Sequence, residues 1–481
     1  MVTMVTDTHL QTMDEYVVDT ILSPTFLITN ESGSEALINH SLIIRGGVVV
    51  DVLPTPTAEK SYSAATTIDM TGQVLLPGFV DAHCYASLCL GNGSHKLNTF
   101  ASRSELTDAI SPAWAATGSA HGGACALLAG TTTLGETLLH AEPGVETGLS
   151  LGLRLALGHA LLPFPSRAAP IPSSAVRRVL DETSAAELAA SDSGVIAGHM
   201  FVLEAPGDHA IDVLERVAAL VRRTGGGIKI VLRQGETHSG HQLVSRLGDA
   251  GLLTPHTVVV HPAELSPESM AVVVEAGARM VYVPQRDARL RAPTLSVAGL
   301  EESGIVVGLG SCGGEGRTPM GMLDVIRMAA LSQGISAAEA IRLGTSGSAA
   351  VLGLGDRLGM LTRGMQADCI AFDLSHPALA LFPDPLDALV FGPPAAPVLT
   401  SVYISGQTRL DHARESAIPA ADLCLLWQRE GWVLTGERKD DSQDSSSSSS
   451  SDLQTSAVIN IPGRGPLKID YEAIMNEYLG A

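Results

Sequence analysis

The sequence predicts an α/β protein, a (β/α)8 TIM-like barrel beside a small β-sandwich that both ends of the barrel-flanking chain form. Three observations carry this prediction. Eight short apolar runs end in polar residues at barrel spacing, and segments of helical periodicity separate them. Strand and helix therefore alternate, as they do around parallel sheets. Short β-branched runs before the barrel return after it, at 367–373 and 402–406, which favours one shared sandwich.

The first part of the chain is expected to form small antiparallel strands. β-Branched runs such as 26–29 and 41–45 are separated there by a glycine pair or by proline, which punctuate strands in this way. The expected division of the chain is 16–72 with 355–415 for the composite β-sandwich, and 73–354 for the barrel.

The barrel strands are expected where the apolar runs lie. Two of the helices between them should begin at Ser-Pro steps, Ser111-Pro112 and Ser266-Pro267. Serine can cap free backbone N–H groups there, and proline fits the first helical turn. The eight expected strands lie near 75–81, 131–137, 154–160, 195–201, 228–234, 257–263, 279–285 and 306–312.

The last part of the chain differs in composition from the rest. From 436 to 481 it contains charged residues and then a run of serines from Ser445 to Ser451, which cannot bury apolar surface. We expect a disordered tail there. A short terminal helix is expected from Leu467 to Leu479, which carries further apolar positions.

Composition limits the partners. The formal net charge of −21 disfavours nucleic acid and anionic membranes, and no apolar stretch reaches the length of a membrane span. The six cysteines are scattered without C-x-x-C spacing, which is typical of buried thiols in a reducing compartment. The first residues do not have the pattern of a signal peptide. We therefore expect a cytoplasmic protein that binds a small molecule.

Several strings, taken in order, resemble the amidohydrolase superfamily. The similarity is to its branch of cytosine and guanine deaminases, S-adenosylhomocysteine deaminases and triazine chlorohydrolases. The strings are LPGFVDAH at 76–83, GTTT at 130–133, GLR at 152–154, LTPHTVVVH at 253–261, GLGS at 308–311 and DRLGMLTRGMQAD at 356–368. The resemblance covers about 16–415.

The resemblance implies a divalent metal, zinc or iron, at the carboxyl ends of the barrel strands. In that family two strand-one histidines, a strand-five histidine and a strand-eight aspartate hold the metal. Water activated by the metal attacks a ring carbon that carries an amino or chloro group. A strand-five glutamate moves protons, and a strand-six histidine orients the nucleophile.

Carried over residue by residue, the family's site is degenerate here. His83 matches the first strand-one ligand, and His261 matches the strand-six histidine. The second strand-one ligand falls on Tyr85 and the strand-eight aspartate on Cys312. The strand-five pattern falls on 231–234, where Val231 has no lone pair and Gln234 cannot transfer a proton.

The candidate catalytic residues are therefore His83, His261, Tyr85 and Cys312. A rearranged metal site could use His83 and Cys312, because a thiolate binds zinc, with an imidazole from beyond strand five. Cys312 could instead be a small core residue. Residues just beyond strand five that could contribute are Glu236, His238 and His241. At other strand ends, Glu136, Arg286 and Asp287 could line a substrate pocket or pair with one another, and an ion pair at the rim is the expected arrangement.

Three functions remain open from the sequence. The first is a hydrolase or deaminase acting on a non-peptide C–N bond of a small cyclic nitrogenous molecule. The second is a catalytically inactive pseudoenzyme that serves as a binding or assembly module. The third is a metal-free isomerase, lyase or cyclisation catalyst using the same imidazoles. Family members often pair through the barrel helices, so a homodimer is one expected assembly.

Overall fold

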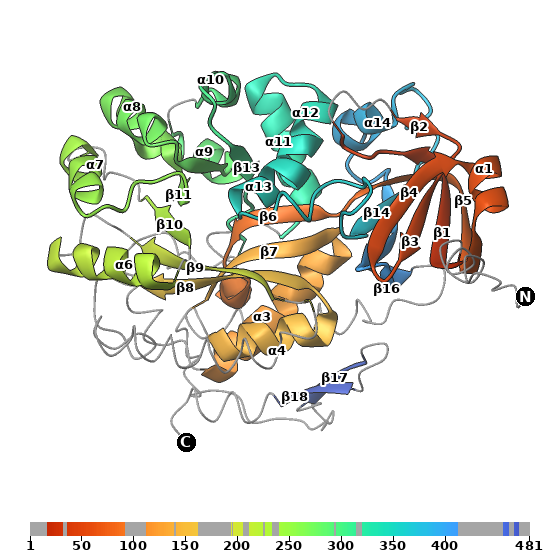
Figure 1. Ribbon diagram of the computed structural model, residues 1–481, viewed down its shortest axis with the longest axis horizontal. Coiled ribbons are helices and arrows are strands. Elements are labelled where there is room, and N and C mark those ends of the chain that lie inside the picture. The colour runs from red at the N-terminus through yellow and green to blue at the C-terminus, as the bar shows by residue number, and fades with distance from the viewer. Residues whose placement is uncertain are drawn as a thin grey trace, which may run out of the picture.

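Two eight-stranded sheets organise the molecule (Figure 1). The computed structural model describes residues 17–31, 36–91, 112–138, 141–161, 194, 196–204, 211–224, 227–232, 240–292, 295–313, 320–411, 456–460 and 466–470. Among these residues no helix combines the length and apolarity needed to cross a bilayer. None of the five cysteines within these ranges forms a disulfide, and four of the five are buried.

The first sheet is the barrel. Its strands are all parallel and stand in the sheet in their order along the chain, which confirms the predicted fold class. The strands are β6 (Phe79–Cys84), β7 (Thr131–Leu138), β8 (Arg154–Leu161), β9 (Ile196–Glu204), β10 (Gly227–Val231), β11 (Thr257–Val260), β12 (Arg279–Tyr282) and β13 (Val307–Leu309).

The first barrel strand begins later than the sequence suggested. Leu75 and Leu76 belong to β5 (Ser63–Pro77) of the other sheet, and β6 starts at Phe79. The apolar run shows no break because both strands are buried. The chain passes between the sheets at Gly78, where an added Cβ would lie 2.2 Å from Thr132 Oγ1.

Backbone hydrogen bonds close the ring between its first and last strands. Cys312 N donates to His83 O at 2.9 Å, and Tyr85 N donates to Gly313 O at 2.8 Å. The closing contacts therefore lie beyond the end of β13, at the carboxyl ends of the strands. Active sites of barrels of this kind are built at that end.

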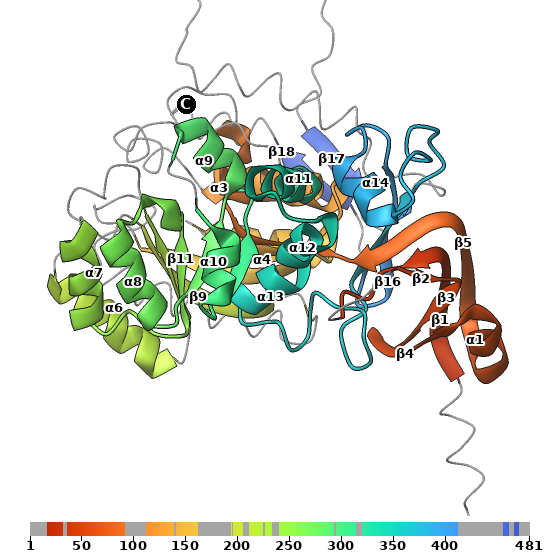
Figure 2. The same ribbon diagram turned by 90° about the horizontal axis from the view of Figure 1, so that it is seen from above.

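Helices surround the barrel (Figures 1 and 2). The expected start at Ser266 is confirmed, because its side chain accepts a hydrogen bond from Ser269 N ahead of Pro267. The helical elements are η2 (Ala86–Gly91), α3 (Pro112–Leu128), α4 (Ala141–Leu151), α6 (Ile211–Thr224), α7 (Gly240–Asp249), η6 (Pro262–Glu264), α8 (Pro267–Glu275), α9 (Pro284–Leu290), α10 (Val297–Glu302), α11 (Met322–Gln333), α12 (Ala337–Arg342), η7 (Leu343–Gly347) and α13 (Ser348–Val351).

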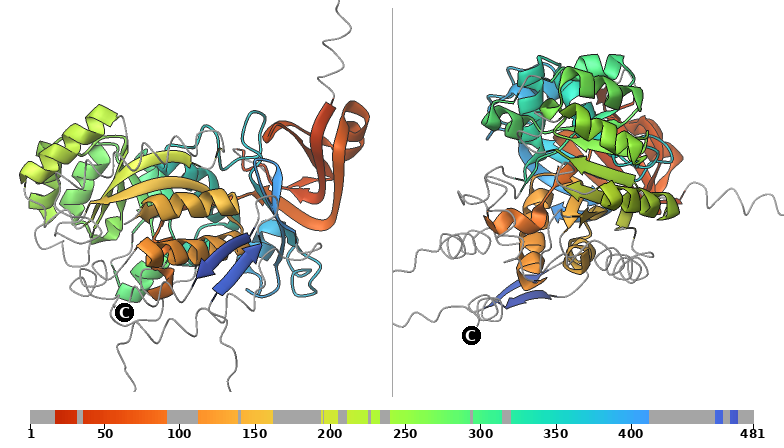
Figure 3. Two further views of the ribbon diagram at one scale, coloured as in Figure 1. Left: turned by 90° about the horizontal axis from the view of Figure 1, so that it is seen from below. Right: turned by 90° about the vertical axis from the view of Figure 1, so that its left-hand side faces the viewer.

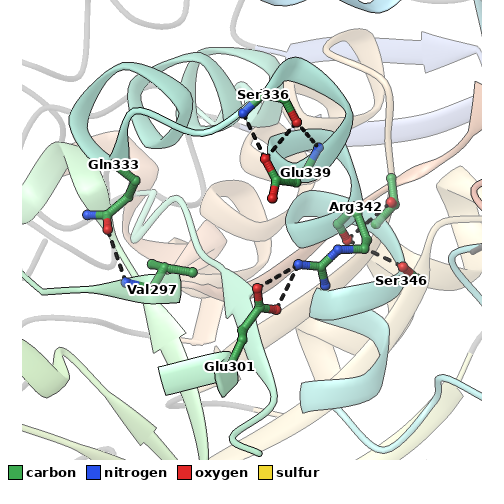
Figure 4. A network of polar contacts seen from close by, with 8 residues as sticks. Val297, Glu301, Gln333, Ser336, Glu339, Arg342 and Ser346 are labelled. Carbon is green, nitrogen blue, oxygen red and sulfur yellow. Dashed lines mark hydrogen bonds and ion pairs between the residues drawn. The ribbon is translucent and has the colours of Figure 1, made fainter. Parts of the chain in front are cut away.

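Polar contacts fix the helices that follow the last strands (Figure 4). Ser336 and Glu339 form a reciprocal capping box at the start of α12. At its other end Arg342 Nη2 reaches both carboxylate oxygens of Glu301 on α10, at 2.8 and 2.7 Å. The hydroxyl of Ser348 then accepts a hydrogen bond from the N–H of the last residue of β13 at 2.9 Å.

The second sheet is mixed and takes strands from both sides of the barrel segment. Its order is β16-β15-β14-β5-β1-β3-β4, with β2 paired to β1. It lies at one end of the molecule (Figure 3). Its further elements are β1 (Val17–Leu27), β2 (Leu37–Ile38), β3 (His40–Arg45), β4 (Val48–Pro54), α1 (Thr55–Ser61), β14 (Cys369–Asp373), α14 (Pro385–Phe391), β15 (Val398–Ile404) and β16 (Gln407–Asp411).

A buried arginine joins the two sheets. Arg154, at the start of β8, makes two hydrogen bonds to the carboxylate of Asp368, at 2.5 and 3.0 Å. The same guanidinium donates to Gln366 Oε1 and to Ser405 Oγ. Asp368 also accepts from Ser405 N, so the ion pair is enclosed by further hydrogen bonds.

Arg154→Ala is expected to lower the free energy of unfolding by about 3 to 5 kcal/mol, because it leaves the buried Asp368 carboxylate unpaired. Urea denaturation measures the change. Asp356→Ala is the control, since its carboxylate is exposed and lies 3.8 Å from Arg357, and it should cost less than about 0.5 kcal/mol. Equal stability of the two variants would show that the junction contributes nothing.

The end of the chain differs from the expectation. β17 (Ser456–Asn460) and β18 (Pro466–Asp470) pair as an antiparallel hairpin, so the first residues of the expected terminal helix lie in a strand. Polar and apolar residues alternate from 467 to 470, which favours a strand over a helix. The rest of that expected helix and the serine run lie outside the described residues.

Candidate functional site

Three of the predicted residues meet at the carboxyl end of the barrel. His83 lies on β6, His261 directly follows β11, and Cys312 follows β13. Their possible ligand atoms all lie within 4.8 Å of one another, and all three side chains are buried. Tyr85 stands beside them, with its ring centroid 4.9 Å from that of His83 in an edge contact. The structure thus brings together all four candidate residues.

Two of these residues have an unusual backbone. His261 has φ 61° and Cys312 has φ 53°, both in the left-handed region. This region costs a residue with a Cβ about 1 to 3 kcal/mol, and such conformations are found where function constrains the chain. Both side chains are therefore held in place by the fold against a local preference.

Asp81 connects the two sides of this site. Its Oδ1 accepts hydrogen bonds from His83 N at 3.1 Å and from Ser311 N at 3.0 Å, and its Oδ2 accepts from Ser311 Oγ. Burial raises the pKa of Asp81 to about 6, although these hydrogen bonds and the charge of Lys229 act to lower it. One carboxyl group therefore fixes the backbone on both sides of the ring closure.

Lys229 is a charged residue that the sequence analysis did not single out. It lies on β10 and is fully buried, and its Nζ donates to Ala82 O at 2.9 Å and to Gly135 O at 3.1 Å. The ammonium group therefore ties strand five to strands one and two. A lysine in the middle of the apolar run 227–231 was the available signal.

Glu136 does not take part in the expected rim ion pair. Its Oε2 accepts from Cys84 Sγ at 3.0 Å and from Ala86 N at 2.8 Å, and its Oε1 accepts from Ser87 N at 3.2 Å. Glu136 thus holds the start of η2, which follows His83 and Tyr85. Burial raises the pKa of Glu136 to about 7, against the opposing effect of these hydrogen bonds.

This raised pKa predicts a pH dependence of stability. A carboxyl group whose pKa is higher in the folded state stabilises the fold at low pH, so the stability is lost as pH rises from about 4.5 to about 7. Glu136 should contribute about 3 kcal/mol to that loss. Urea denaturation at pH 4.5 and 7.5 should show a flatter profile for Glu136→Gln, and an unchanged one for the exposed Glu59→Gln. Identical profiles for both variants would contradict the assignment.

The other two rim residues pair with each other and also with Glu264. Arg286 Nη1 lies 3.1 Å from Glu264 Oε1 and 3.5 Å from Asp287 Oδ1, and all three side chains are buried. Glu264 lies in η6, one turn after His261. Burial raises the pKa of Asp287 to about 6, while the charge of Arg286 opposes the rise.

Strand five supplies no ligand at its described end. Val231 is buried in an apolar cluster of the barrel, with Tyr85 and Cys312 among its members. Gln234, Glu236 and His238 lie outside the described residues, as does the side chain of His241. Within the described chain the second imidazole of the cluster comes from strand six instead.

Comparisons with known proteins agree with this architecture. The sequence profile of the Amidohydrolase family matches residues 74–409. The 5-methylthioadenosine/S-adenosylhomocysteine deaminase of Teredinibacter turnerae is 27% identical over 416 residues, which cover 81% of this chain and 90% of that protein. A similar protein of the same name from Syntrophobacter fumaroxidans is 26% identical, over 78% of this chain and 89% of its own.

Solved structures share the fold. An adenosine deaminase from Xanthomonas campestris with bound zinc superimposes with a TM-score of 0.79 at 23% identity, over 87% of this chain and 99% of that chain. The atrazine chlorohydrolase of Arthrobacter aurescens complexed with zinc gives a TM-score of 0.73 at 19% identity, over 85% and 99%.

Proposed function

The chain belongs to the amidohydrolase family, and from that premise we propose that it is a metal-dependent hydrolase that removes an amino group from a small nitrogen-containing ring. In this proposal His83, His261 and Cys312 hold the metal. The observation that carries it is the convergence of their three donor atoms within 4.8 Å at the carboxyl end of the barrel.

The donor set suits zinc. Catalytic zinc sites use three protein ligands and leave one position open, and imidazole nitrogen and thiolate sulfur are both preferred donors. With bonds of about 2.0 Å to nitrogen and 2.3 Å to sulfur, the donors of a tetrahedral site lie about 3.3 to 3.5 Å apart. The three donor atoms lie within 4.8 Å of one another, so small shifts of the side chains would let all three bind one ion. When bound, zinc supplies Lewis acidity, which makes water nucleophilic near neutral pH.

The chain's own residues orient the ring and exclude water. Buried apolar side chains pack with Tyr85 and Cys312 in one cluster, and these include Leu88 and Trp114. An apolar, partly aromatic wall suits a planar heterocycle. We assign the phenol of Tyr85, whose ring lies beside that of His83, to hold a proton for the departing amine.

An adenine-bearing nucleoside is the proposed substrate, since the similar curated proteins are named as deaminases of such molecules. One water adds at the ring carbon and ammonia leaves, so that an amino-purine becomes an oxo-purine. The acidic chain and its scattered cysteines support a cytoplasmic protein that acts on small molecules.

Ammonia release tests the proposal. Zinc-loaded protein is expected to deaminate at least one of adenosine, 5-methylthioadenosine and S-adenosylhomocysteine, and chelation should abolish the reaction until zinc is restored. His376→Ala, which changes an exposed histidine in the segment after β14 of the second sheet, is the control and should keep full activity. Turnover by metal-free protein would favour acid–base chemistry, and zinc-loaded protein inert towards all three would contradict the proposal.

A further inference from the structure

The first barrel strand carries a β-bulge beside the candidate site. The register of β6 against β7 shifts between Asp81 and Cys84. Within that interval Ala82 and His83 together face one residue of β7, Gly135. An added Cβ at Gly135 would lie 2.5 Å from Ala82 O, so glycine is needed opposite the bulge. Bulges occur next to active sites, where they re-aim a side chain, and here that side chain is the imidazole of His83.

Lys229 reaches this bulge across the barrel. Strands β8 and β9 stand between β7 and β10 in the sheet, so the Lys229 side chain crosses the interior. Its Nζ donates to Ala82 O at 2.9 Å and to Gly135 O at 3.1 Å, and both carbonyl groups belong to the bulge. Residues two apart on a strand share a face, so Lys229 lies one layer deeper than Val231, which packs in the same cluster as Cys312. The ammonium group therefore approaches the site from beneath.

The peptide unit between Ala82 and His83 is held at both of its polar atoms. Its carbonyl oxygen accepts from Lys229, and its N–H donates to Asp81 Oδ1 at 3.1 Å. Because a peptide unit is planar, these two hydrogen bonds fix its plane and thereby the direction in which the His83 side chain leaves the backbone. His83 O in turn accepts from Cys312 N at 2.9 Å. The backbone of one proposed metal ligand is thus tied to Lys229 on one side and to another ligand on the other.

We propose that Lys229 is a positioning residue for the metal site, whose ammonium group holds the β6 bulge and so aims His83 at the ion. This inference rests on the proposed function, which requires that ion. Loss of a partner that orients a ligand typically weakens metal binding about ten- to a hundredfold. Charge alone has the opposite effect, because an ammonium group repels a divalent cation and its removal would tighten binding. The direction of the change in zinc affinity therefore separates the two roles.

Competition for zinc with a chromophoric chelator measures this affinity. Lys229→Met is expected to bind zinc about ten- to a hundredfold more weakly than the wild type. Gly135→Ala disturbs the same bulge without removing the charge, and it should also bind zinc more weakly. Arg154→Ala is the matched control, since it breaks a buried ion pair at the start of β8 and should bind zinc as the wild type does. In the cobalt-substituted protein the d–d absorption reports ligand geometry, so it should change in Lys229→Met and stay the same in Arg154→Ala.

Three results would overturn the positioning role. These are unchanged or tighter zinc binding by folded Lys229→Met or Gly135→Ala, an unchanged cobalt spectrum in Lys229→Met, and equal weakening in Arg154→Ala. Thermal unfolding shows whether each variant is folded. If Lys229→Met is not, Lys229→Gln decides, because its shorter side chain cannot donate to both carbonyl groups and should also weaken zinc binding.

The same measurements distinguish this inference from the proposed function. Zinc affinity that depends on Lys229, without ammonia release by the wild type, would uphold the positioning role and contradict the proposed activity. Ammonia release by a wild type whose zinc affinity does not depend on Lys229 would leave the activity standing and overturn the positioning role. A wild type that binds no zinc would contradict both.

Discussion

His83→Ala is expected to abolish both zinc binding and ammonia release, with turnover reduced at least a thousandfold. It removes one of three protein ligands, and two remaining donors cannot hold a divalent ion against water. Metal content by atomic absorption and turnover under the same conditions measure the two effects. Retained stoichiometric zinc in this variant would show that His83 is not a ligand.

Cys312 gives a matched comparison at the same site. Cys312→Ala should lose the metal as His83→Ala does, whereas Cys312→Asp restores the family's strand-eight donor type and should still bind zinc. If Cys312→Ala keeps zinc and turnover, the thiol is a packing residue. Cys312→Ala removes the metal-binding atom, whereas Cys312→Asp changes the side chain but keeps a metal-binding atom, so the comparison tests whether the donor atom is what matters.

Lys229→Met is expected to lower the free energy of unfolding by about 1.5 to 3 kcal/mol, because it leaves two buried carbonyl groups without their charged hydrogen-bond donor. The substitution keeps most of the side-chain volume. It removes the donor to Ala82 O and Gly135 O and the positive charge that lowers the pKa of Asp81. Urea denaturation at neutral pH measures the loss.

The loss should be larger at pH 7.5 than at pH 4.5, because Asp81, with its pKa of about 6, is protonated at the lower pH and then needs no compensating charge. Lys60→Met on the exposed face of α1 is the control and should change stability by less than about 0.5 kcal/mol. A Lys229→Met variant as stable as the wild type would mean that the buried ammonium contributes nothing to the barrel.

Most of the barrel could be predicted, because apolar residues recur at different intervals in strands and in helices, and because buried parallel strands form short apolar runs. The first strand was misplaced, since Leu75 and Phe79 belong to one apolar run. Only the fold shows that the chain changes sheets at Gly78. The start of the expected terminal helix was wrong, because the few apolar residues from 467 to 470 fit either periodicity.

The site was only partly predictable. Motif positions identified His83, His261 and Cys312, but their convergence depends on left-handed backbone at two of them, which tertiary contacts impose. The hydrogen bond between Glu136 and Cys84 follows from the β6–β7 register, which places these two residues opposite each other. The role of Lys229 depends likewise on carbonyl groups of strands far away in the sequence.

X-ray absorption at the zinc edge of the purified protein tests the metal site most directly. The site predicts one sulfur at about 2.3 Å and two imidazole nitrogens at about 2.0 Å, and loss of the sulfur in Cys312→Asp. A zinc shell without sulfur in the wild type, or full ammonia release by protein that contains no metal, would contradict it.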